Sequence, residues 1–109
     1  MKIKLNCPST GEEEAKAASD VIRSGNLLLG DKVKQFEEEF ARYIGAKYAI
    51  ATSSGSTALH TMLLANGLGS WNEVITTPFS FIATSTSILH IGAEPVFVDI
   101  EQDTFNLDP

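Results

Sequence analysis

The chain has 109 residues, 43% of them hydrophobic, with 8 basic and 14 acidic side chains and a formal net charge of −6. These values describe one small globular domain, and they argue against nucleic-acid binding because no cluster of Lys and Arg is present. A single cysteine excludes an internal disulfide, and with neither a signal-like leader nor an apolar run near the ~18 residues of a membrane span we expect a cytoplasmic protein without a membrane partner.

The first expected helix begins at Thr10. Thr10 and Glu13 have the spacing of a capping box, and Gly25 provides a typical helix stop. The loop that follows contains three consecutive leucines, Leu27–Leu29. Adjacent leucines in a loop need cover from the rest of the protein or from a partner chain.

The second expected helix is capped by Asp31 and ends at Gly45. Its apolar residues recur with helical period and predict one buried face. They are Val33, Phe36, Phe40, Tyr43 and Ile44. Residues 48–51 then predict a strand buried on both faces.

The remaining chain alternates helices and strands. We expect a helix over 56–66, a strand over 73–76, a helix over 80–91 and a strand over 95–99. Alternating elements with short connections predict an α/β fold, with a parallel sheet and covering helices.

Residues 53–59 give the strongest indication of a ligand site. They join an expected strand to an expected helix through small hydroxyl residues around Gly55. The free N–H groups of a first helical turn attract phosphate, but Ser and Thr are equally typical of a simple N-cap. Local sequence therefore leaves both interpretations open. Because ligands lie beyond the carboxyl ends of parallel strands, we expect residues 77–81 at the same edge.

Several short motifs follow one another at characteristic spacing. They are Ser24-Gly25 with Gly30, Phe36-Glu37, Phe40-Ala41 with Tyr43 and Gly45, Ser54-Gly55-Ser56 with Ala58-Leu59-His60, Glu73-Val74-Ile75, Pro78 with Phe81, Ala83-Thr84, and Gly92-Ala93-Glu94-Pro95-Val96-Phe97-Val98-Asp99. In this order they resemble the amino-terminal part of the DegT/StrS-type sugar aminotransferases, which use pyridoxal phosphate on the fold type I scaffold. The resemblance extends over almost the whole chain.

The resemblance implies a fold and a cofactor site. The fold would be part of the three-layer αβα large domain, with a mainly parallel sheet. Gly55 and Ser56 correspond to the family's Ser-Gly-Thr motif, which holds the cofactor phosphate, with Ser in place of Thr. Phe81 corresponds to the aromatic residue that stacks on the pyridine ring, whereas without the resemblance it would be taken for a core residue.

Other positions are expected to be structural. Where the family usually reads Gly-Asp-Glu-Val, this chain reads Trp71-Asn72-Glu73-Val74, and we expect Trp71 to be half-exposed at the surface. His60 and His90 do not pair with Cys7 or a carboxylate at metal-ligand spacing, so no metal site is expected.

The positions of the lysines bear on whether this chain can be active alone. Such a transaminase needs a lysine to hold the cofactor and an acidic residue on the pyridine nitrogen, and the resemblance implies that both lie downstream. The chain's lysines all precede residue 48. We therefore expect an inactive amino-terminal fragment that is not stable alone, with a helix and loop over 1–30 and the incomplete start of the cofactor-binding domain over 31–109.

The resemblance implies an enzyme that aminates a nucleotide-linked keto sugar, with glutamate as amino donor. Family members are homodimers, so Leu27–Leu29 is expected to face a dimer partner. Three alternatives stay open. They are a sugar dehydratase of the same family with histidine in place of lysine, a regulatory or sensing member, and a small nucleotide-binding α/β domain.

Overall fold

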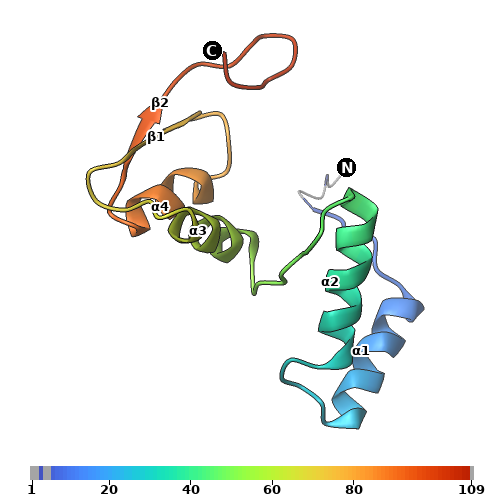
Figure 1. Ribbon diagram of the computed structural model, residues 1–109. Coiled ribbons are helices and arrows are strands. Elements are labelled where there is room, and N and C mark those ends of the chain that lie inside the picture. Colours follow the sequence, from blue (N-terminus) through green and yellow to red (C-terminus); the bar gives the residue numbers. More distant parts are fainter. Residues whose placement is uncertain (1–2, 4–5, 109) are drawn as a thin grey trace. The chain divides into compact units, whose positions relative to one another are not determined.

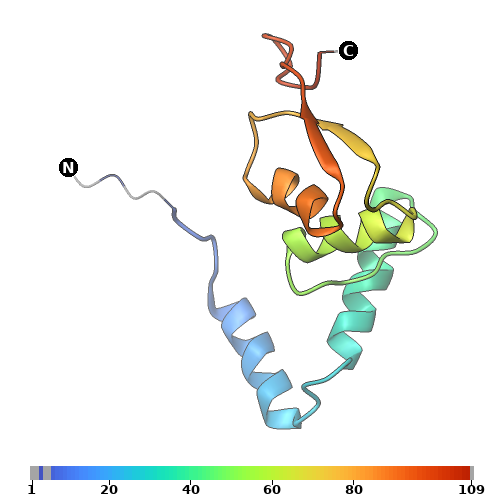
Figure 2. The same cartoon turned by 90° about the vertical axis from the view of Figure 1, so that its left-hand side faces the viewer.

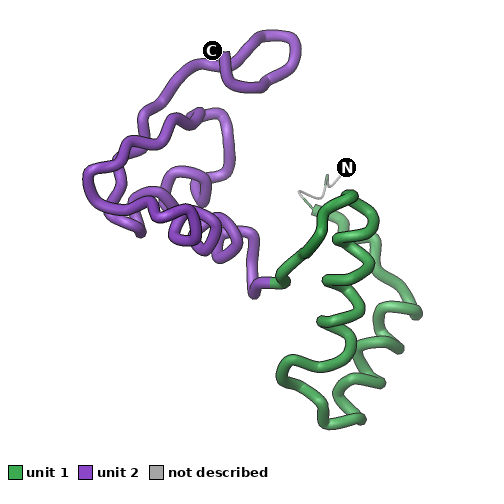
Figure 3. The backbone as a smooth tube through the Cα atoms, in the orientation of Figure 1, with its two compact units in different colours: residues 1–51 green, residues 52–109 purple. Residues whose placement is uncertain are grey.

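The computed structural model describes residue 3 and residues 6–108, and it divides the chain into two compact units. Unit 1 comprises residues 1–51 and unit 2 residues 52–109 (Figure 3). In the part of the chain that the structure describes, unit 1 contains α1 and α2, and unit 2 contains α3, β1, α4 and β2 (Figure 1).

The first helix of unit 1, α1, spans Glu12–Ser24. The expected cap at Thr10 and Glu13 is wrong by one residue. Gly11 is the N-cap, and its backbone N–H donates to the Glu14 carboxylate over 2.7 Å. This hydrogen bond lowers the pKa of Glu14, because it stabilises the ionised carboxylate. The helix ends as expected at Gly25, whose φ of 70° is one that glycine adopts without strain.

The second helix, α2, spans Asp31–Ile44. Its N-cap is Gly30 and not the expected Asp31, which instead occupies the first turn, where a negative charge favours the helix dipole. Ala41 is the buried residue of α2, and α1 has none. The expected apolar stripe exists on α2, where Phe36 and Phe40 stack with ring centroids 5.6 Å apart, yet both rings stay exposed.

The strand expected over residues 48–51 is wrong for this structure. The segment has no strand assignment, and the Ala51 N–H donates to the Glu37 carboxylate over 2.7 Å. The expected burial on both faces is wrong as well, since Tyr48 and Ile50 are largely exposed. A strand needs a hydrogen-bonding neighbour, and the described residues provide none for this segment.

Unit 2 has the expected α/β order, α3–β1–α4–β2. Helix α3 spans Gly55–Ala65, strand β1 spans Glu73–Thr76, helix α4 spans Ala83–His90 and strand β2 spans Glu94–Phe97. The strands pair in parallel, with Glu73 opposite Glu94 and Thr76 opposite Phe97. Helix α4 begins later than residue 80, because residues 77–82 form a turn in which the Phe79 N–H donates to the Thr77 hydroxyl over 3.0 Å.

A small core holds unit 2 together. Leu63 of α3, Ile88 of α4 and Ala93 before β2 form a buried cluster. Helix α4 packs against both strands and against α3 (Figure 2). Ile75 of β1 is 63% exposed, so the other face of the strand pair is uncovered within unit 2. This packing fixes the start of α3 relative to the start of α4. Among the residues described, no helix has both the length and the apolar character needed to cross a membrane.

Candidate functional site

The principal candidate site is a cavity of about 530 Å³ in unit 2. It lies where α3 begins and where the chain enters α4. Its lining residues are Gly55, Ser56, Ala58, Leu59, Phe81, Ala83 and Thr84. All three residues singled out from the sequence, Gly55, Ser56 and Phe81, therefore line one cavity although they come from segments about 25 positions apart.

The first turn of α3 has two backbone donors to offer. Ser54 is the N-cap, and its hydroxyl accepts from the Thr57 N–H over 3.2 Å, while its carbonyl accepts from the Ala58 N–H over 3.0 Å. The N–H groups of Gly55 and Ser56 make no hydrogen bond within the helix, since the first donors of a helix lack intrahelical acceptors. Capping and phosphate binding are thus compatible, because they use different residues of the same turn.

The absence of a side chain at Gly55 leaves space for a ligand. A Cβ atom built at this position would meet no protein heavy atom within 4 Å, and its φ lies outside the left-handed region. The fold therefore does not require glycine here for backbone conformation or internal packing. Its missing side chain leaves open space beside the free N–H groups, which suits an anion with several oxygens.

The hydroxyl groups of this segment are mostly engaged with one another. Ser54 Oγ lies 2.8 Å and Ser53 Oγ 3.2 Å from Thr57 Oγ1. The hydroxyls of Ser54 and Thr57 therefore stabilise the turn. The backbone N–H groups and the hydroxyl of Ser56, which lines the cavity, are the donors left for a ligand.

Phe81 provides an apolar surface at the same cavity. Its side chain is 75% exposed, so the interpretation as a core residue is wrong. Phe81 precedes the N-cap Ile82 of α4, and its carbonyl accepts from the Thr84 N–H over 3.0 Å. An exposed ring beside an anion site suits a ligand with both an aromatic ring and a phosphate.

Ser87 is a supporting residue that the sequence analysis did not identify. It is 2% exposed, and its hydroxyl donates to the Ala83 carbonyl over 2.7 Å while lying 3.4 Å from the Ser56 carbonyl. Ser87 thus joins α4 to the first turn of α3 directly below the cavity. Its position about one turn into α4 gave no separate signal, because Ser and Thr recur over residues 80–87.

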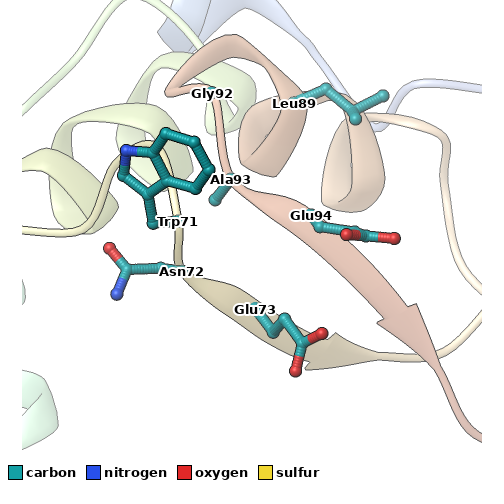
Figure 4. Close-up of a pocket in the computed structure, with 7 residues that line it drawn as sticks. All are labelled: Trp71, Asn72, Glu73, Leu89, Gly92, Ala93 and Glu94. Carbon is teal, nitrogen blue, oxygen red and sulfur yellow. The ribbon is translucent and has the colours of Figure 1, made fainter.

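A second cavity of about 680 Å³ lies at the amino ends of the strands (Figure 4). Trp71 and Asn72 precede β1 there, and Glu73 and Glu94 begin the two strands. Trp71 is fully exposed, not half-exposed as expected, and has a left-handed φ of 78°. This cavity therefore lies at the opposite end of the strands from the carboxyl edge, where ligands bind in parallel sheets.

The histidines form a pair between α3 and α4. The rings of His60 and His90 meet edge to face with centroids 6.0 Å apart. Within the described part of the chain, no group of three or more His, Cys, Asp or Glu side chains is placed to hold a metal ion.

Comparison with known families gives an extended match. The model of the DegT/DnrJ/EryC1/StrS aminotransferase family matches residues 8–109. The match includes most of unit 1, all of unit 2 and every residue of the candidate cavity.

Individual relatives agree with this match. The chain is 47% identical over 107 residues to the spore coat polysaccharide biosynthesis protein SpsC of Bacillus subtilis, covering 98% of this chain and 28% of the relative. It is 43% identical over 89 residues to the UDP-2-acetamido-2-deoxy-3-oxo-D-glucuronate aminotransferase of Pseudomonas aeruginosa, covering 82% of this chain and 25% of that protein. The chain thus spans about a quarter of the length of these relatives.

A solved structure shares the fold. The Escherichia coli GDP-4-keto-6-deoxy-D-mannose-3-dehydratase with bound hydrated pyridoxal phosphate superposes with a TM-score of 0.84 at 34% identity, covering 95% of this chain and 28% of that one. Its backbone therefore resembles this chain over both units.

Proposed function

This chain belongs to the DegT/DnrJ/EryC1/StrS aminotransferase family, and from that premise we propose that the whole protein transfers an amino group to a nucleotide-linked keto sugar with pyridoxal 5′-phosphate as cofactor. One observation supports this most directly. Free N–H groups at the start of α3 and the exposed ring of Phe81 line the same cavity. A phosphate and an aromatic ring are what pyridoxal phosphate presents.

Two segments of unit 2 bind different parts of the cofactor. The N–H groups of Gly55 and Ser56 hold the phosphate, and the positive end of the α3 dipole favours its charge. Phe81, which lines the same cavity, would stack on the pyridine ring and orient it. When bound, the cofactor supplies an electron sink for the bond broken at the amino-bearing carbon. This chain's contribution is to orient that ring and to anchor its phosphate.

The amine that holds the cofactor comes from elsewhere. Unit 2 contains no lysine in its sequence, since the last lysine of the chain is Lys47. We therefore propose that residues 31–109 are the start of the cofactor-binding domain, that residues 1–30 precede it as a helix and loop, and that these residues alone are inactive. The lysine and the acid on the pyridine nitrogen would come from outside residues 1–109.

The substrates and the assembly belong to the same proposal. The Pseudomonas relative is named for a UDP-linked keto sugar and the dehydratase for a GDP-linked one. These names support a nucleotide-linked keto sugar here, and we propose glutamate as amino donor. The exposed Leu27–Leu29 loop supports a homodimer with this apolar loop at its interface.

The test uses the full-length protein saturated with pyridoxal phosphate. Incubation with glutamate is expected to release 2-oxoglutarate, and subsequent addition of a UDP-linked 3-keto or 4-keto sugar is expected to give an amino sugar by mass spectrometry. Without the sugar, release of 2-oxoglutarate stops after one equivalent per active site. Absence of amino transfer to any keto sugar, with cofactor bound, would contradict the proposed reaction.

A second candidate function is dehydration of such a sugar. The shared backbone of the pyridoxal phosphate-bound dehydratase supports it, because the fold of these residues is common to both activities. In the same incubation a dehydratase would give a sugar that has lost a hydroxyl oxygen and gained no nitrogen, with the amine of glutamate released as ammonia. The two reactions are therefore separated by product mass alone.

A further inference from the structure

The last described segment of unit 2 forms a closed loop over residues 99–108. Ile100 and Leu107 form an isolated antiparallel bridge. The Glu101 N–H donates to the Asn106 carbonyl over 2.9 Å, and the Asp108 N–H donates to the Asp99 carbonyl over 3.1 Å. These backbone hydrogen bonds fix the loop as a unit with a defined tip.

The tip of this loop places Phe105 in an unfavourable backbone conformation. Its φ is 59°, in the left-handed region that non-glycine residues rarely adopt. The conformation is held by the Phe105 N–H, which donates to the Glu101 carbonyl over 3.0 Å, and by Thr104, whose hydroxyl donates to the Glu101 carboxylate. These hydrogen bonds of the loop therefore hold Phe105 in place despite the cost of its backbone conformation.

The ring of Phe105 lies against Phe79. Their centroids are 5.7 Å apart with an interplanar angle of 30°, a favourable stacking distance. Both rings remain more than half exposed, so this contact does not belong to the core of unit 2. It joins the 99–108 loop to the turn between β1 and α4.

That turn carries Phe81, two residues beyond Phe79, and has few other constraints. The Phe79 N–H donates to Thr77 Oγ1 over 3.0 Å, and the hydroxyls of Ser80 and Thr84 lie 3.0 Å apart. Both contacts are local to the turn and the helix that follows. Among the contacts described for this turn, the Phe79–Phe105 stacking is the one that reaches a distant segment.

We propose that Phe105 is a positioning residue for the cofactor site: it holds the 77–82 turn through Phe79 and thereby sets the orientation of Phe81. This inference rests on the proposed function, because it assumes that Phe81 stacks on the cofactor. Phe105 does not line the cavity of Gly55 and Phe81. It acts on the orientation of bound cofactor and not on its chemistry.

The experiment compares Phe105→Ala, Phe105→Leu and Phe105→Tyr in the full-length protein. Pyridoxamine 5′-phosphate is the probe, because it binds without a covalent bond to lysine. The readouts are its dissociation constant and the circular dichroism of its absorption band at saturation, which reports ring orientation. Trp71→Ala is the matched control, since it removes an exposed aromatic side chain at the other end of the strands.

The proposal predicts that Phe105→Ala weakens binding by about three- to tenfold and diminishes the dichroism of bound cofactor. Phe105→Leu gives the same change while preserving apolar bulk, so it answers the question even where the alanine variant fails to fold. Phe105→Tyr restores both readouts, and Trp71→Ala leaves both unchanged.

Three results have distinct meanings. Unchanged affinity and dichroism in Phe105→Leu would overturn the positioning role while leaving the proposed function intact. A raised KM for the sugar with unchanged cofactor readouts would also overturn it, by assigning the ring pair to substrate binding. A wild-type protein that binds no pyridoxamine phosphate would instead contradict the proposed function itself.

Discussion

The helices of the two units are regular in both, but they differ in how much of their apolar surface is buried. In unit 2, α3 and α4 share a buried cluster with the strands, and Ile88 is 2% exposed. In unit 1, α1 buries no residue and α2 buries only Ala41, although α2 carries a regular apolar stripe. A helical period therefore specifies a helix, whereas only a packing partner makes that helix stable.

The difference also locates the candidate site. The cavity of Gly55, Ser56 and Phe81 is built on the unit that has its own core. Its geometry depends on α3 and α4 packing together, with Ser87 between them. The apolar stripe of α2 instead needs cover that unit 1 does not provide. This difference in packing between the two units leads to predictions for single substitutions.

The largest effect is expected from the core of unit 2. Ile88→Ala should destabilise unit 2 by about 3 kcal/mol, because it removes buried methylene groups and leaves a cavity. Amide hydrogen exchange in α4 and β1 should accelerate by about 100-fold. The matched substitution Phe36→Ala, on the exposed stripe of α2, should change exchange in α2 by less than about fivefold. Equal effects of the two substitutions would contradict the difference in packing between α4 of unit 2 and α2 of unit 1.

A smaller effect is expected from backbone strain at the turn before β1. Trp71→Gly should stabilise unit 2 by about 0.5–1 kcal/mol, because glycine adopts the left-handed φ freely and the exposed indole contributes no burial. Calorimetry should show a melting temperature raised by about 4 °C.

Trp71→Ala is the control for this gain, because alanine removes the same ring yet keeps the strained conformation. Leu29 has a left-handed φ of 47° in unit 1, so Leu29→Gly relieves similar strain there. It should leave the cooperative transition of unit 2 unchanged. A lower melting temperature for Trp71→Gly would show that the indole makes stabilising contacts.

The smallest effect concerns the cap of α1. Because the Gly11 N–H lowers the pKa of Glu14 in the folded state, the resulting stabilisation is complete above the ordinary glutamate pKa. It is lost as pH falls through the lowered value. NMR chemical shifts of residues 11–15 should show the first turn of α1 loosening in that acidic range, and Glu14→Gln should abolish this pH dependence. An unchanged pH dependence in the Gln variant would assign the transition to another group.

Much of the fold could be predicted from sequence because the signals were local. Gly25 and Gly45 end their helices as expected, and β1 occupies residues 73–76. The failures arose where local signals compete or are insufficient. Glu13 and Glu14 are both able to cap α1, and residues 48–51 have strand composition without a described neighbour.

The site was predictable to a similar extent. A glycine between hydroxyl residues drew attention to Gly55, whereas Ser56 and Phe81 were singled out through the family resemblance, and the structure brings all three to one cavity. Ser87 and Phe105 were not found, because their roles depend on contacts with residues 31 and 26 positions away. Long-range contacts of this kind leave no periodic or motif signal.

If the start of α3 holds the cofactor phosphate, Gly55→Val in the full-length protein should disturb cofactor binding without disturbing the fold. A Cβ at this position meets no protein atom, so the melting temperature without cofactor should be unchanged. Affinity for pyridoxamine phosphate should fall by at least about tenfold, because the side chain displaces the phosphate from its N–H donors. Gly11→Val, at the N-cap of α1, should leave affinity unchanged. Unaltered affinity in Gly55→Val would show that the start of α3 does not hold the cofactor phosphate.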